Sequence, residues 1–193
     1  MKKEKLNGKD LMNVGIYSAI YFVIVFVIAM LGYIPIFMPL ICVIAPIICG
    51  IPFMLFLTKV KKFGMILIMS LIMGLMMLLT GMGYYSIIVG AISGLAAEAV
   101  YKSGGYKSVV KAVLTSGVFS IWMWGNFIPL FTNIDQYFST RQDYGQEYID
   151  TLTSIMPLWM CPVLFIAAIV CGIIGGLIGK NLMKKHFVKA GIV

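Results

Sequence analysis

Six long apolar runs alternate with short polar segments along the chain. The runs cover residues 11–31, 37–57, 63–80, 84–101, 108–130 and 157–182. A helix that crosses a bilayer needs about 20 predominantly apolar residues, and each run reaches or approaches that length. The pattern predicts an all-α polytopic membrane protein with six transmembrane helices in a single domain over residues 1–193.

The only long polar interruption is the segment 131–156, which lies between the last two runs. Composition agrees with this assignment, since 61% of the residues are hydrophobic and 11% are charged. Soluble domains contain about 45–50% apolar and about 25% charged residues. We therefore do not expect a soluble enzyme, a disordered chain or a disulfide-rich secreted scaffold.

All but one of the basic residues fall on the same side of the six predicted helices. The segments of that side contain Lys2, Lys3, Lys5, Lys9, Lys59, Lys61, Lys62, Lys102, Lys107, Lys111, Lys180, Lys184, Lys185 and Lys189. Only Arg141 lies on the opposite side. Because Lys and Arg near helix ends mark the cytoplasmic side, both termini are predicted to lie in the cytoplasm, with the protein in the cell membrane. The net charge of +8 then indicates contact with the lipid bilayer and no nucleic-acid partner.

Aromatic and amide side chains gather at the predicted outer end of the helices. All three tryptophans lie there, whereas an aromatic belt occupies both membrane interfaces. This one-sided excess predicts a pocket for a flat, polar small molecule, capped by residues 32–39. The candidate substrate-binding residues are Tyr84, Tyr85, Trp122, Asn126, Tyr137 and Trp159.

Helical spacing distinguishes some of these residues. Trp122 and Asn126 are four positions apart and share a helix face, whereas Trp124 points elsewhere and is expected to face lipid. An amide near hydrocarbon must be hydrogen-bonded, and for Asn126 a bond to another helix and a bond to a ligand are equally open. The outer segment 131–156 carries Asp135, Asp143, Glu147 and Asp150, which with Arg141 give a net charge of −3. This charge slightly favours a neutral or cationic substrate, although exposed loop acids are usually just solvated.

Small residues recur at four-residue spacing on three of the predicted helices. The pairs are Gly15 and Ala19, Gly90 and Gly94, Gly172 and Gly176, and Gly175 and Gly179. Such pairs let helices approach closely, either within the protein or against a partner. On the first helix the rest of the surface is bulky, so the pair there leaves room for a partner helix outside the chain.

Glu98 is the only acidic residue inside a predicted span, close to its cytoplasmic end. Acidic residues in spans are functional candidates by default. Lys102 follows one turn later, in the order that favours an ion pair on a helix. A local ion pair is therefore expected, with proton coupling as the alternative.

Groups that could carry catalysis or bind a metal are scarce. The four cysteines, Cys42, Cys49, Cys161 and Cys171, form no C-x-x-C motif, and the single histidine is His186. No metal site, cofactor or catalytic residue is therefore expected. The sequence also lacks the phosphate-binding G-x-x-x-x-G-K-[ST] motif. The chain is thus not expected to be an enzyme or to hydrolyse ATP itself.

Two stretches resemble a known group of membrane transport subunits. They are residues 7–23 (NGKDLMNVGIYSAIYFV) and 83–98 (GYYSIIVGAISGLAAE), with the proline-rich run 37–57 between them. On these residues the chain resembles the substrate-binding S component of an energy-coupling factor (ECF) transporter, and more narrowly the Trep-Strep family. The resemblance covers nearly the whole chain.

The resemblance implies a division of labour. An S component captures a vitamin or a related micronutrient outside the cell, while a transmembrane T component and two cytoplasmic ATPases supply the energy for uptake. The family's A-x-x-x-A motif, which contacts the T component, corresponds to Gly15 and Ala19. The family's pocket is built from outer loops and helices four to six.

Two alternatives stay open at this point. One is a stand-alone secondary transporter or small channel, although the sequence lacks recognisable inverted repeats with broken helices and buried charges. The other is a non-transport membrane assembly protein, against which no residue argues. The sequence does not identify a substrate.

Overall fold

The computed structural model describes residues 5–139, 141 and 144–184, and every regular element within them is a helix. This confirms the all-α class. The predictions that concern Lys2, Lys3, Asp143, Lys185, His186 and Lys189 lie outside the described residues.

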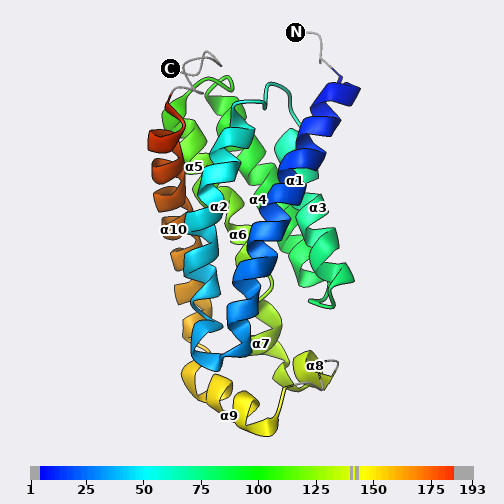
Figure 1. Ribbon diagram of the computed structural model, residues 1–193, viewed down its shortest axis with the longest axis vertical. Coiled ribbons are helices and arrows are strands. Elements are labelled where there is room, and N and C mark those ends of the chain that lie inside the picture. The colour runs from blue at the N-terminus through cyan, green and yellow to red at the C-terminus, as the bar shows by residue number, and fades with distance from the viewer. Residues whose placement is uncertain (1–4, 140, 142–143, 185–193) are drawn as a thin grey trace.

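The long helices form an elongated bundle (Figure 1). They are α1 (Gly8–Ala29), α2 (Ile41–Leu57), α3 (Met65–Leu79), α4 (Tyr85–Ser103), α5 (Val109–Phe119) and α10 (Met160–Leu182). The short elements are η1 (Met30–Tyr33), η2 (Pro35–Phe37), α6 (Ile121–Trp124), α7 (Ile128–Thr132), α8 (Ile134–Ser139) and α9 (Gln146–Ile155).

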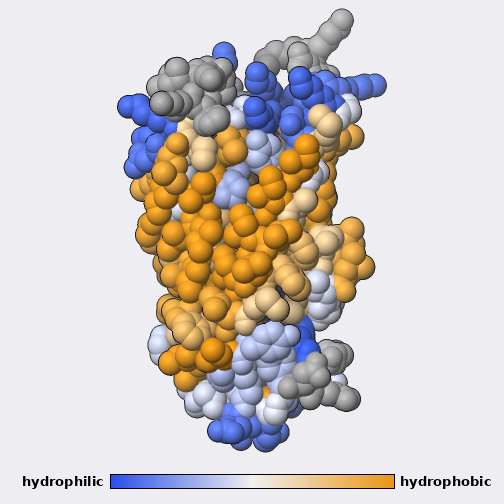
Figure 2. Space-filling model, viewed as in Figure 1, coloured by the Kyte–Doolittle hydropathy of each residue, from blue (hydrophilic) through white to orange (hydrophobic). Residues whose placement is uncertain are grey.

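An apolar belt separates two polar ends of the molecule (Figure 2). One end, called the lysine end below, holds the start of α1, the end of α10 and the α2–α3 and α4–α5 loops (Figure 1). These segments carry the described lysines, which are Lys5, Lys9, Lys59, Lys61, Lys62, Lys102, Lys107, Lys111, Lys180 and Lys184. The opposite end, called the cap end, is formed by η1, η2, α8 and α9 and holds Arg141.

Two helical stretches are long and apolar enough to cross a membrane, namely Gly8–Tyr33 and Met160–Leu182. Three further apolar helices, Ile41–Leu57, Met65–Leu79 and Val109–Trp124, are shorter. The chain therefore contains helices that can span a bilayer. The number of six spans and the cytoplasmic position of both termini stay predictions.

The start of α1 is fixed by a reciprocal pair of hydrogen bonds. The backbone N–H of Asp10 donates to the side chain of Asn7, and the Asp10 carboxylate accepts the backbone N–H of Asn7, each at 2.9 Å. Lys62, in the α2–α3 loop, donates to the same carboxylate at 2.9 Å. The Asn7 N–H and the Lys62 ammonium hold the pKa of Asp10 below its usual value, because their hydrogen bonds to the carboxylate favour its ionised form. The contact joins α1 to the α2–α3 loop at the lysine end.

The fifth predicted helix is interrupted in the structure, where residues 108–130 form α5, α6 and the start of α7. At the first break, Ser120 Oγ donates to the carbonyl oxygen of Ser116 at 2.8 Å, a bond that bends helices. At the second break, Gly125 lies so close to α4 that a Cβ there would come within 2.8 Å of an α4 side chain. Pro129, in the first turn of α7, has no N–H to continue the hydrogen bonds of α6. The chain therefore bends near the cap end.

The glycines of α10 allow close contacts with other helices of this chain. A Cβ on Gly50 of α2 would lie 2.3 Å from the carbonyl carbon of Gly175, and a Cβ on Gly175 would lie 2.4 Å from the carbonyl oxygen of Pro46. On another face of α10, Gly172 and Gly176 pack against α5 and its following residue in the same way. Without these glycines the main chains could not approach this closely.

The pair on α4 is also internal. A Cβ on Gly94 would lie 2.6 Å from Ser70 Cβ on α3, and Ser70 Oγ donates to the carbonyl oxygen of Gly90 at 2.6 Å. The pair on α1 differs, because Gly15 and Ala19 are both exposed and nothing lies within 4 Å of a Cβ built on Gly15. Of the predicted small-residue pairs, only the one on α1 packs against no other helix of the described chain.

Substitution of Gly50 by Ala is expected to lower the free energy of unfolding by about 1–3 kcal/mol, because the added methyl group would meet the main chain of α10. Gly15→Ala is the matched control, and it should leave stability unchanged or slightly raised, since the methyl group meets nothing and Ala favours a helix. Thermal unfolding of both variants in the same detergent measures the difference. Equal melting temperatures would show that the Gly50–Gly175 contact is not required.

Candidate functional site

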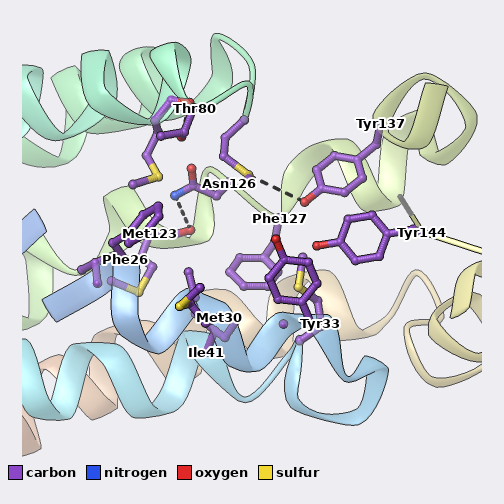
Figure 3. A pocket seen from close by; sticks show the side chains of 16 residues that line it. Phe26, Met30, Tyr33, Ile41, Thr80, Met123, Asn126, Phe127, Tyr137 and Tyr144 are labelled. Carbon is purple, nitrogen blue, oxygen red and sulfur yellow. Dashed lines mark hydrogen bonds between the residues drawn. The ribbon is translucent and has the colours of Figure 1, made fainter. Parts of the chain in front are cut away.

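A cavity of about 170 Å³ lies near the cap end, between the last turns of α1, the end of α3 and the bend that follows α6 (Figure 3). It is lined by Val25, Phe26, Ala29, Met30, Gly32, Tyr33, Met38, Ile41, Met77, Thr80, Met82, Met123, Asn126, Phe127, Tyr137 and Tyr144. None of these side chains is charged at neutral pH. Most of the lining is apolar or aromatic, as is usual for small-molecule sites.

Asn126 is the only amide side chain that lines the cavity, and two of its hydrogen bonds are internal. Its Oδ1 accepts from Ser86 Oγ on α4 at 2.5 Å, and its Nδ2 donates to the carbonyl oxygen of Met123 at 3.1 Å. An amide group has two N–H donors and two acceptor lone pairs. One donor and one lone pair therefore remain for a ligand, so the interhelical bond and ligand binding are compatible.

Tyr137 lines the cavity from α8 and is held there by Arg141. The Arg141 guanidinium carbon lies 3.7 Å from the centre of the Tyr137 ring. The guanidinium also donates to the carbonyl oxygen of Tyr137 and, at 2.5 Å, to that of Gly81 in the α3–α4 turn. The hydroxyl of Tyr137 contacts Met82 Sδ at 3.8 Å (Figure 3). Arg141 thus fastens α8 to the α3–α4 turn.

An aromatic cluster lies on the side of the cavity that faces the cap end. The rings of Tyr33 and Tyr144 stack with centres 5.8 Å apart, and those of Tyr144 and Tyr148 lie 4.5 Å apart. The hydroxyl of Tyr148 donates to the carbonyl oxygen of Gly32. Burial raises the pKa of Tyr148 well above its usual value, so this hydroxyl is a donor at neutral pH. The bond fastens α9 to the turn that follows α1.

Gly32 occupies a tight place in that turn. A Cβ at this position would lie 3.0 Å from Met38 Sδ and 3.1 Å from a methyl carbon of Ile41. Residues 32–39 were predicted to cap the pocket, and Gly32, Tyr33 and Met38 do line the cavity.

Trp122 does not line the cavity, although it was a candidate for the pocket. It is fully buried and lies about one helical turn before Asn126 in the chain. The centre of its ring is 6.1 Å from the centre of the Tyr21 ring. Phe53 and Phe119 stack beside this pair with ring centres 4.2 Å apart. These rings fill the part of the bundle between the cavity and the lysine end.

Trp124, expected to face lipid, is partly buried and joined to α10. Its Nε1 donates to the carbonyl oxygen of Cys161 at 2.9 Å, and its ring lies edge-on to that of Phe165. Its side chain thus packs on α10, a neighbour that the helical spacing alone does not identify.

The other three candidates lie away from the cavity. Tyr84 and Tyr85 stack on each other with ring centres 4.6 Å apart, and Tyr84 is exposed. Trp159, at the start of α10, is also exposed. Of the six candidate residues, the structure therefore brings only Asn126 and Tyr137 to this cavity.

Most of the residues that line the cavity are not among those predicted from the sequence. Five of the lining residues are methionines, namely Met30, Met38, Met77, Met82 and Met123. The chain contains 15 methionines, and this excess was an available signal, because flexible thioether side chains often line adaptable binding surfaces. The resemblance placed the pocket in outer loops and helices four to six, whereas α1 and α3 contribute to this cavity and the long helices α4 and α10 do not.

Glu98, the acid inside a predicted span, caps a neighbouring helix. It is fully buried, and its Oε2 accepts the backbone N–H groups of Ile66 at 2.9 Å and Leu67 at 3.3 Å. These are the first free N–H groups of α3, whose preceding residue Gly64 has no side chain to cap them. The hydroxyl of Tyr106 donates to Oε1 at 3.3 Å.

The predicted ion pair between Glu98 and Lys102 is wrong. Within the described residues, the only ion pair joins Lys62 and Asp10. Lys102 Nζ lies 5.1 Å from the ring centre of Phe63 instead. The start of α3 attracts the carboxylate because its N–H groups and helix dipole both favour a negative charge.

Comparison with known proteins identifies a family. The model of a family described as "Hypothetical bacterial integral membrane protein (Trep_Strep)" matches residues 8–189. This confirms the resemblance to the Trep-Strep family that the sequence indicated. No curated protein and no solved structure matches the chain.

Substitution of Tyr148 by Phe is expected to loosen α9, because it removes the hydroxyl that binds the turn after α1. The loss of one hydrogen bond is worth about 1 kcal/mol, which corresponds to roughly fivefold faster amide exchange in α9 if the helix opens locally. Hydrogen–deuterium exchange measures this. Thr151→Val is the control, since that hydroxyl bonds only within α9. Unchanged exchange in Tyr148→Phe would mean that the bond does not hold the cap.

Substitution of Glu98 by Ala is expected to destabilise the protein by about 1–3 kcal/mol, because it leaves buried N–H groups of α3 without acceptors. Glu98→Gln keeps a carbonyl oxygen at the same position, so its effect should be smaller. Thermal unfolding in detergent compares the two variants. If both lose the same stability, the negative charge and not the acceptor geometry is the essential property.

Proposed function

The chain belongs to the Trep_Strep family of bacterial integral membrane proteins, and on this premise we propose that it is the substrate-binding membrane subunit of an ECF-type ABC transporter. In this role it captures a vitamin-like micronutrient outside the cell. A transmembrane T component and two cytoplasmic ATPase subunits drive uptake with ATP. The observation that carries the proposal is the unpartnered small-residue pair on α1.

The exposed pair fits a contact with a partner helix. Gly15 and Ala19 lie one turn apart on the same face of α1, and both are exposed. The larger side chains of that helix surround them, including Ile16 and Ile20, which are about half exposed. The other small-residue pairs are already filled by helices of this chain. A shallow notch in an otherwise bulky apolar helix allows a second helix to approach closely.

The cavity fits the capture of a small molecule. It lies near the cap end, away from the lysine end that is predicted to face the cytoplasm. It is enclosed by α1, α3 and the bend after α6, and the aromatic cluster lies between it and the cap end. A ligand would therefore enter from the predicted outer side.

Both features share one helix. The half of α1 near the lysine end carries Gly15 and Ala19, and the half near the cap end lines the cavity with Val25, Phe26 and Ala29. A rigid helix of this kind can report a change at the cavity to a partner that holds its other half. This connection supports the assignment of a binding subunit that acts through other subunits.

The alternative of a stand-alone secondary transporter or small channel is less well supported in its proton-coupled form. Such a transporter needs an intramembrane acid that can exchange protons along a path. Glu98, the acid inside the predicted spans, is fully buried and bound to the start of α3. Its bonds give it a structural role in α3. A non-transport assembly protein is distinguished by the experiment below.

The double variant Gly15→Leu, Ala19→Leu is expected to lose its partners without losing its fold. A tagged wild-type chain purified from its native membranes in mild detergent should carry the T component and both ATPases. The variant should carry at least about tenfold less of them, because two leucines keep the partner helix from close approach. Mass spectrometry of the purified material measures the ratio.

Ala96→Leu is the matched control, since Ala96 is also an exposed small residue within an apolar helix, here α4. It should carry wild-type amounts of the partners. Equal recovery with the wild type and the double variant would reject the contact on α1. The absence of any ATPase with the wild type would reject the ECF transporter subunit and leave the stand-alone transporter or channel and the assembly protein, which a measurement of flux in liposomes without partners separates.

A further inference from the structure

The cavity offers no partner for a charged ligand. The 16 lining residues include no Asp, Glu, Lys, Arg or His. A charge that leaves water for such a site loses its hydration and gains no ion pair, which is strongly unfavourable. The chemistry of the lining thus favours an uncharged molecule.

The charged groups nearest the cavity are already committed or face solvent. Arg141 lies on the ring of Tyr137 and donates to two main-chain carbonyl oxygens, one of them that of Gly81. The described acids of the outer segment, Asp135, Glu147 and Asp150, are exposed and do not line the cavity. Among the residues that the structure describes, an anion would therefore find no free cation at the cavity, and a cation would find no carboxylate.

The aromatic rings do not form a cage for a cation either. Cation–π binding requires an open ring face within about 6 Å of the charge. One face of Tyr137 is covered by Arg141, whose positive charge would also repel a second cation. Tyr33 and Tyr144 stack against each other, with an angle of 19° between their planes. The faces that such a cage would need are thus partly occupied.

The groups that remain for a ligand are an amide edge and an apolar wall. Asn126 keeps one N–H and one acceptor lone pair, so it can both donate a hydrogen bond to an amide-type ligand and accept one from it. Phe26 and Phe127 supply aromatic surface beside it, and five methionines can adapt to the shape of a ring. The volume of about 170 Å³ is below the usual range of about 300–1,000 Å³ for drug-sized ligands, so the occupant is small.

We propose that this cavity binds an uncharged molecule that carries one ring and an amide-type donor–acceptor edge, with Asn126 as the residue that recognises the edge. The proposal rests on the proposed function, in which the cavity is the capture site. It narrows the substrate class from micronutrients in general, many of which are ionised, to neutral compounds of this kind.

A series of three compounds tests the role of charge. Benzamide, benzoate and benzamidinium share the same ring and differ mainly in the charge of the polar group. The purified chain in detergent, near neutral pH, is expected to bind benzamide at least about tenfold more tightly than either ion, because each ion would be buried without a partner. Ligand-observed NMR titration measures these affinities, including weak ones.

Variants at Asn126 locate the binding. Asn126→Leu should weaken benzamide binding by about tenfold, because both amide hydrogen bonds are lost. Asn126→Asp has nearly the same shape and adds a negative charge, so it should shift the preference to benzamidinium. Asn181→Leu is the matched control at the lysine end, where the side chain is exposed, and it should bind benzamide like the wild type.

Three results would overturn the proposal. They are tighter or equal binding of benzoate or benzamidinium by the wild type, no binding of any of the three compounds, and an unchanged benzamide affinity in Asn126→Leu. Recovery of the ATPases with the wild-type chain is measured separately and does not depend on these compounds. A wrong substrate class is therefore distinguishable from a wrong assignment of the transporter subunit.

Discussion

The close approach of main chains is the constraint on which the rest of this protein depends. Lipid tails are as apolar as the side chains that face them, so helices in a bilayer associate through tight packing and hydrogen bonds. The contact of Gly50 with Gly175 joins α2 to α10, and Gly94 lets α4 lie directly on α3 at Ser70. The small-residue pairs on α4 and α10 are thus occupied by other helices of this chain. The notch at Gly15 and Ala19 is the small-residue pair that no helix of the described chain fills.

The cavity lies where this tight packing stops. Between the cavity and the lysine end, large rings such as Trp122 and Phe119 are buried in the bundle. Above them the chain bends after α6, because Gly125 packs on α4 and Pro129 cannot continue the helix. The resulting space is lined in part by flexible methionine side chains. Arg141 binds the turn at Gly81 and Tyr148 binds the turn at Gly32, and these two contacts hold the cap end in place.

The sequence predicted the helical class and the family well, because apolar length and charge distribution are properties of whole segments. It predicted the site poorly. Asn126 and Tyr137 reach the cavity, but Trp122 lies one turn too deep and Trp159 faces outward. Trp122 is buried against Tyr21 of α1, and contacts between helices of this kind are not contained in the spacing of residues along one helix. Glu98 shows the same limit, since its partners Ile66 and Leu67 lie about 30 residues earlier in the chain.

The carboxylate of Glu98 has a consequence for the order in which the helices gain their stability. α3 precedes α4 in the chain, so its first N–H groups have no acceptor until Glu98 of α4 reaches them. Polar groups without partners are costly in hydrocarbon, and so is an unpaired carboxylate. Each helix therefore supplies what the other lacks, so the start of α3 is completed only when α4 packs against it, and the two helices gain their stability as a pair.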